Sequence, residues 1–176
     1  VIPENTWTAD RAENLRLSIC GYLEKHGVEA QVRIQPGEDH WSGIRELVRA
    51  YGYGPITPNT VLIGVSDKPE NLLPFARLVQ LIAHTRRNLI IVRETDDESD
   101  ADAEPCIDIW WRGLAPNVAF MLALACMVRR SSDWSGARLR LCRIVEKEEA
   151  RDEAQRTLSA FLAQARVDAE VAVLTQ

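Results

Sequence analysis

Three histidines are the side chains best suited to metal binding or proton transfer in this 176-residue sequence. His26, His40 and His84 stand far apart, and none has a cysteine, a second histidine or a carboxylate at the spacing of a metal site. Each falls at an end of a predicted helix, so we interpret them as surface or capping residues. The sequence also lacks a Gly-x-Ser-x-Gly elbow, a Walker loop and a His-Glu-x-x-His motif. We therefore expect no metal site, no catalytic site and a protein that is not an enzyme.

A glycine-rich stretch at 51–64 is the other candidate for chemistry, because glycines can cradle a phosphate. Such a cradle needs its glycines after a strand and before a helix, whereas Gly52 and Gly54 precede the apolar run 61–63. Prolines in the stretch fix φ, and Asn59 and Thr60 can bond the neighbouring backbone. The stretch therefore predicts a structural turn that leads into a buried central strand. A phosphate loop like that of universal stress proteins is the weaker alternative.

Acidic residues occupy seven of the eleven positions between Glu94 and Glu104. The run lacks the glycine and the terminal glutamate spacing of a calcium-binding EF-hand loop. We therefore predict a solvated, mobile loop at 94–104 that separates two halves of one domain.

The elements that must position these residues follow from apolar periodicity, which predicts alternating helices and strands. Asp10 and Glu13 have the spacing of a capping box, and Asp39 can cap the second helix. We expect helices near 9–26, 40–51, 71–87, 118–128 and 150–165, and strands near 28–34, 61–63, 88–92, 106–111, 137–145 and 169–174.

This alternation predicts an α/β fold, because parallel strands need crossover helices. We expect a single domain over 1–176, built as a three-layer sandwich in which helices flank a mixed, mostly parallel sheet of about six strands. The strands at 88–92 and 106–111 have no helix between them. One of them is therefore expected to pair antiparallel, or the acidic loop to cross an end of the sheet.

Two apolar features bear on packing and assembly. Trp110 and Trp111 are adjacent on a strand and point to opposite faces, so we expect one or both in the core, with helices on each side. The helix at 118–128 is apolar almost all round and must be covered on more than one side. Core packing is the first interpretation of this helix, and a subunit interface at Phe120, Met121 and Leu124 is the second.

The composition is that of an ordinary globular protein, with 46% hydrophobic and 27% charged residues. A net charge of -5 argues against binding to nucleic acid or to an anionic membrane surface. Four cysteines without Cys-x-x-Cys spacing indicate neither a zinc site nor a disulfide framework. The longest apolar run, 118–128, falls short of the roughly 20 residues that span a bilayer, which indicates a soluble segment. The start at Val1 leads us to expect a piece of a longer protein.

Residues 52–64, Gly-Tyr-Gly-Pro-Ile-Thr-Pro-Asn-Thr-Val-Leu-Ile-Gly, resemble the Gly-x-Gly-x-x-x-Pro-Asn-Thr-Val-Leu-x-Gly signature of the C-terminal domains of cation-chloride cotransporters. Further pieces follow in the family's order at 88–93, at 107–111 before Gly113-Leu114, and at Trp134 before 139–141. The residues that carry the signature are Gly52, Gly54, Pro58, Asn59, Thr60, Gly64, Asp108, Trp110 and Trp111.

This resemblance implies a cytosolic regulatory domain, with a fold like that of universal stress proteins, attached to the membrane-spanning part of a prokaryotic sodium, potassium and chloride symporter. It also implies a homodimer at the cytoplasmic face of the membrane, without nucleic acid and without membrane insertion of this segment. Family domains have two such lobes, and this chain resembles the second.

The sequence departs from the family after Trp111, where only Arg112 stands before Gly113-Leu114 in place of a longer acidic and glycine-containing turn. Some family members hold a nucleotide in this domain, but no nucleotide-binding residue can be matched here, so we expect no cofactor. A nucleotide-binding sensor of the universal stress type is the alternative function.

Overall fold

The computed structural model describes residues 1–52, 58–65, 68–93, 104–112 and 117–176. The chain divides into two compact units, residues 1–96 and 97–176. The predicted acidic loop at 94–104 lies outside the described residues, apart from Glu104. That 1–176 forms a single domain stays a prediction.

The fold is α/β, as predicted, and every strand pair among the described residues is parallel. Of the two expectations for 88–92 and 106–111, the antiparallel pairing is therefore wrong, and the crossing of the acidic loop over an end of the sheet concerns residues outside the described ranges. The strands form three separate sheets of two, two and three strands. The prediction of a single sheet of about six strands is wrong as well, because no ladder in the described residues joins these sheets.

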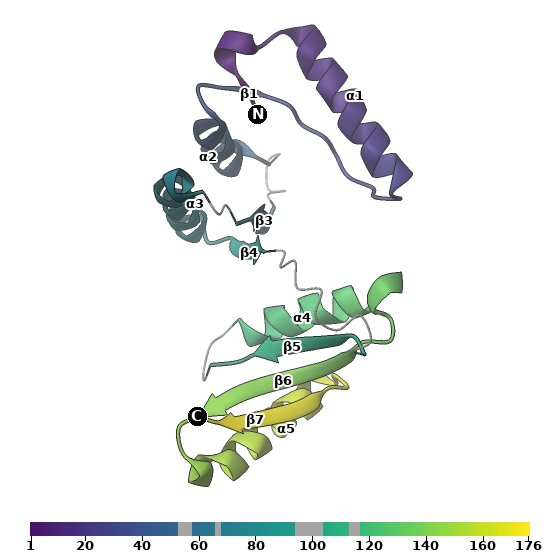
Figure 1. Cartoon of the computed structure of the whole chain (residues 1–176), viewed down its shortest axis with the longest axis vertical. Helices are drawn as coiled ribbons and strands as arrows, with labels where there is room; N and C mark the ends of the chain where they lie inside the picture. The colour runs from purple at the N-terminus through teal and green to yellow at the C-terminus, as the bar shows by residue number, and fades with distance from the viewer. Residues whose placement is uncertain (53–57, 66–67, 94–103, 113–116) are drawn as a thin grey trace. The chain divides into compact units, whose positions relative to one another are not determined.

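The first unit has short elements, and its longer helices lie close to the predicted ranges (Figure 1). Its elements are β1 Ile2–Pro3, a 3-10 helix Glu4–Thr6, α1 Ala9–Lys25, β2 Pro36–Gly37, α2 His40–Ala50, β3 Thr60–Gly64, a 3-10 helix Pro69–Asn71, α3 Leu72–His84 and β4 Asn88–Val92.

Local capping sets where the first two helices begin. Asp39 caps α2 as predicted: its carboxylate accepts from the Ser42 amide at 2.8 Å, and its own amide donates to Ser42 Oγ at 3.0 Å. At α1 the cap is Thr8, whose Oγ1 accepts from the Arg11 amide at 3.2 Å. The expected capping box at Asp10 is therefore wrong, and Asp10 lies in the first turn, where its charge suits the helix dipole.

No strand forms at 28–34, although apolar and polar residues alternate there. A segment with alternating residues becomes a strand only where a neighbouring strand is available for backbone hydrogen bonds. The first strand after α1 is instead the two-residue β2, which pairs with β1. Arg33 in this segment lies over the Tyr51 ring, with its guanidinium carbon 5.7 Å from the ring centroid.

The core of the first unit lies between α2, α3 and one face of the β3–β4 pair. Val48, Leu78 and Ile82 are buried there, with half-buried side chains of Val61, Ile63 and Leu89 against them. The other face of β3 is open, and Leu62 is 65% exposed. The prediction that 61–63 is a fully buried central strand is wrong, because among the described residues β3 pairs only with β4 and helices cover one side. Ile91 and Val92 at the end of β4 are exposed as well.

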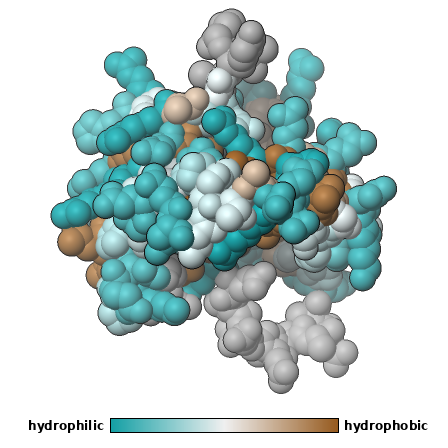
Figure 2. All heavy atoms as spheres, turned by 90° about the horizontal axis from the view of Figure 1, so that it is seen from above, coloured by the Kyte–Doolittle hydropathy of each residue, from teal (hydrophilic) through white to brown (hydrophobic). Residues whose placement is uncertain are grey.

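The second unit alternates strands and helices, near the predicted ranges (Figure 1). Its elements are β5 Cys106–Trp110, α4 Val118–Arg129, a 3-10 helix Ser132–Trp134, β6 Arg138–Val145, a 3-10 helix Glu148–Ala150, α5 Arg151–Ala165 and β7 Glu170–Thr175. No helix in the described ranges is both long enough and apolar enough to cross a membrane. The surface drawn in Figure 2 is mostly hydrophilic, and apolar side chains appear there as separate patches.

Candidate functional site

The sheet of the second unit places β6 between β5 and β7, with all three strands parallel. Side chains alternate between its two faces. One face packs against both helices in a single core; its buried members include Ile109, Leu139, Leu141 and Val173 from the strands, with Leu122 from α4 and Leu158 and Leu162 from α5. Among the described residues of this unit, α4 and α5 thus cover the same face. Helices on both sides of this sheet were expected, and that expectation is wrong here.

An ion pair occupies the open face. Arg140 on β6 lies opposite Asp108 on β5, and its Nε and Nη2 donate to the two carboxylate oxygens at 2.7 and 2.6 Å. The Cys106 thiol, two residues before Asp108 on the same face, donates to Asp108 Oδ1 at 3.3 Å. The Arg140 hydrogen bonds hold the pKa of Asp108 below its usual value. Burial and the neighbouring carboxylate raise the pKa of Cys106, so this thiol is a poor nucleophile.

The carboxyl half of the open face is apolar. Trp110 is 48% exposed, Ile144 is 55% exposed and Leu174 is 49% exposed. Cys142 lies opposite Trp110 in the ladder and is buried. Of the two adjacent tryptophans, only Trp111 packs against the core, where its ring lies 5.4 Å from that of Phe161.

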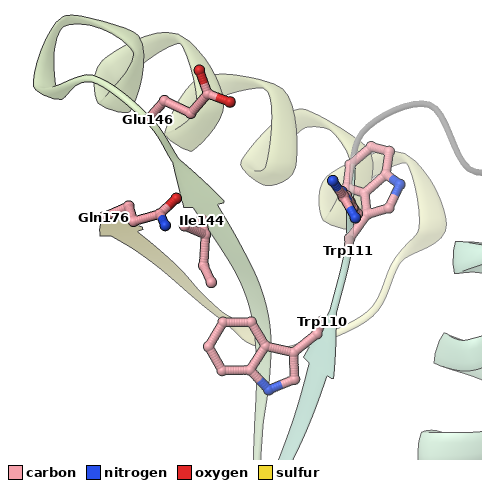
Figure 3. Close-up of a pocket in the computed structure, with 6 residues that line it drawn as sticks. Trp110, Trp111, Ile144, Glu146 and Gln176 are labelled. Atoms are coloured by element: carbon pink, nitrogen blue, oxygen red, sulfur yellow. The ribbon is translucent and has the colours of Figure 1, made fainter.

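A cavity of about 450 Å³ opens at the carboxyl ends of the three strands. It is lined by Trp110, Trp111, Arg112, Ile144, Glu146 and Gln176. In Figure 3 the Trp110 ring extends across the sheet towards Ile144, and the Trp111 ring points away from the Trp110 ring. An exposed aromatic face, one guanidinium and one carboxylate in such a cavity suit a small planar molecule with polar substituents.

The signature residues at 52–64 lie in the first unit, whereas Asp108, Trp110 and Trp111 lie in the second. Gly52 has φ 146°, a conformation that favours glycine, whereas Gly54 lies outside the described residues. Asn59 directly precedes β3, which begins at Thr60. The backbone N–H of Asn88 donates to the Asn59 carbonyl at 2.8 Å, and Thr60 Oγ1 donates to Asn59 Oδ1 at 2.9 Å.

Two further signature residues frame this strand. Pro58 is half-buried just before β3. Gly64 ends β3, where a Cβ would meet nothing within 4 Å, so close packing does not require glycine at this position.

The predicted interface residues lie on α4. Val118, Leu122 and Ala125 are the buried residues of this helix. Phe120, Leu124 and Met127 repeat the same spacing two residues later, which places them about 200° round the helix from the buried stripe. Phe120 and Leu124 are half-buried, and Met127 is 66% exposed. Met121, the remaining predicted residue, is half-buried and packs against the core.

Sequence reasoning missed the partner of Asp108 and most of the cavity lining. The available signal was the alternation of Arg138, Arg140 and Cys142, which places them on one face, but their partners depend on the register between β5 and β6. No group of three metal-ligating side chains occurs among the described residues. His26 and His84 lie at helix C-terminal ends, where Nδ1 contacts the carbonyl oxygens of Tyr22 and Gln80 at 2.7 and 2.6 Å.

A scan of the chain against models of known protein families finds no match.

Proposed function

We propose that this chain is a non-catalytic regulatory and dimerisation domain of a cation-chloride cotransporter-like membrane transporter, with a fold related to universal stress proteins. Ion binding and transport belong to a membrane-spanning part of the same protein, and the domain works at the cytoplasmic face of the membrane. The resemblance of residues 52–64 to the family signature motivates the family.

The observation that carries the dimerisation role is the second apolar stripe of α4. A helix that packs one side on a sheet normally presents polar residues on the other side. Here Phe120, Leu124 and Met127 lie about 200° from the buried stripe, and a second copy of the domain would bury them. Two-fold pairing would place the same helix of each copy at the interface.

The coding sequence that surrounds this chain tests the transporter assignment. We expect it to encode about a dozen upstream segments, each of roughly 20 apolar residues, with Lys and Arg enriched in the cytoplasmic loops. An open reading frame without such segments would overturn the assignment to a transporter, whatever the oligomeric state of the domain.

A nucleotide-binding sensor is the second candidate, and the cavity at the carboxyl ends of β5, β6 and β7 favours it. Ligands of open α/β sheets bind outside this edge, and the exposed Trp110 ring could stack on a base. Calorimetry and thermal shift with ATP, ADP and AMP test this reading. It predicts heat and stabilisation that a Trp110→Leu variant loses, and neither signal at millimolar nucleotide would leave it without support.

A further inference from the structure

A second cavity, of about 370 Å³, lies in the first unit near the amino end of β3. Its described lining comes from the segment before β2, the end of α2, the start of β3 and the residue before β4. The lining residues are Gln31, Arg33, Leu47, Val48, Tyr51, Pro58, Thr60, Val61, Leu62 and Arg87. None of them is acidic, and two are arginines.

Both guanidinium groups are held by partners that carry no charge. Arg87 Nη1 donates to the Val48 carbonyl at 2.5 Å, near the end of α2, and Arg33 lies over the Tyr51 ring. In the described ranges, neither arginine makes an ion pair with a carboxylate. Each therefore keeps N–H groups for a ligand, in an orientation already restricted by its partner.

The rest of the lining defines the ligand further. Tyr51, Thr60 and Gln31 can supply neutral hydrogen bonds, while Leu47, Val61 and Leu62 add apolar atoms to the lining. Guanidinium forks match the oxygens of phosphates and carboxylates. A phosphate monoester carries a charge of about −1.5 to −2 at neutral pH. The two positive charges of the arginines therefore match a phosphate monoester better than a carboxylate, which carries a single negative charge.

We propose that this cavity binds a phosphate monoester with an apolar organic part, in which Arg33 and Arg87 hold the phosphate and the β3 side chains contact the organic part. The site is independent of the proposed dimer and of the cavity beside Trp110.

Titration of the full chain with phenyl phosphate, followed by amide chemical shifts, tests the proposal. We expect saturable shifts at Gln31, Thr60 and Leu62 with a dissociation constant on the order of 1 mM. Phenylacetate, with one charge fewer, and benzyl alcohol, with none, should bind more weakly. Equal or tighter binding of either compound would overturn the assignment to a phosphate.

Substitutions distinguish binding in this cavity from non-specific attraction of the phosphate to any arginine on the surface. Arg33→Gln should weaken phenyl phosphate by about tenfold or more, because a charge-assisted hydrogen bond is lost. The matched control is Arg49→Gln, an exposed arginine in the last turn of α2 outside the lining, which should leave the affinity unchanged. No saturable shift by about 20 mM ligand, or equal weakening in both folded variants, would contradict the site.

Discussion

Arg140 and Asp108 form a bidentate ion pair across adjacent parallel strands, with N–O distances of 2.7 and 2.6 Å. Because the two residues lie directly opposite each other in the ladder, the pair favours the observed alignment of β5 and β6. The stability of this strand pairing thus depends in part on whether the Asp108 carboxylate is ionised.

The ion pair predicts a dependence of stability on pH. The pKa of Asp108 is lower in the folded chain, so the folded state favours the ionised carboxylate. Its contribution is present above the unfolded value of about 3.9 and is lost as the pH falls through the folded value. Because Asp108 is partly exposed, Asp108→Asn should cost about 1 kcal/mol or less at pH 7. The free energies of unfolding of the two proteins in urea should converge as the pH falls below about 3.9. A difference that stays constant as the pH is lowered through this range would contradict the coupling.

The core of the second unit predicts a large cost for a cavity. Leu158 on α5 is fully buried, and Leu158→Ala should lower the free energy of unfolding by about 2 to 5 kcal/mol. Leu174, which is about half exposed on the open face, serves as the control, and Leu174→Ala should cost less than about 1 kcal/mol. Equal losses in chemical denaturation would mean that the open face is covered in solution.

Two glycines of the signature stretch predict opposite outcomes. Gly52 has φ 146°, so Gly52→Ala should destabilise by about 1 to 3 kcal/mol through backbone strain. Gly64 has open space at its Cβ position, and Gly64→Ala should be neutral or slightly stabilising, by less than about 1 kcal/mol. Thermal unfolding of the two variants gives the comparison, and a neutral Gly52→Ala together with a damaging Gly64→Ala would reverse the account of this turn.

The start of α1 can be tested locally, because this helix buries none of its residues. Thr8→Ala removes the acceptor of the Arg11 amide and should weaken the first turn by about 1 kcal/mol. Amide hydrogen exchange should therefore speed up at Arg11. Asp10→Asn, which keeps the size of the side chain, should change this exchange much less, and the opposite ranking would restore Asp10 as the cap.

The helices were predictable from the sequence because their signals are local. Asp39 and its neighbours within one turn mark the start of α2, and apolar spacing marks the helix at 118–128. The α/β class follows from the same alternation.

Sheet pairing was not predictable in the same way. The segment 28–34 alternates like a strand but forms no ladder with any part of the chain that the structure describes. The apolar run 61–63 predicts a buried strand, although Leu62 is exposed. Both outcomes depend on segments that are distant in the sequence, because these provide the neighbouring strand for hydrogen bonding and the helices that bury a face. The Asp108–Arg140 pair has the same origin, because 32 positions separate its members and only the register between β5 and β6 joins them.

The oligomeric state of the chain, measured by size exclusion with light scattering across a concentration series, tests the proposed dimerisation role most directly. We predict a particle of twice the chain mass that dissociates in Leu124→Gln and Met127→Gln, the variants of the outer stripe of α4. Leu62→Gln, a matched change at an exposed leucine of the first unit, should leave the dimer intact. A strict monomer at high concentration, or a dimer indifferent to both α4 variants, would contradict the proposal.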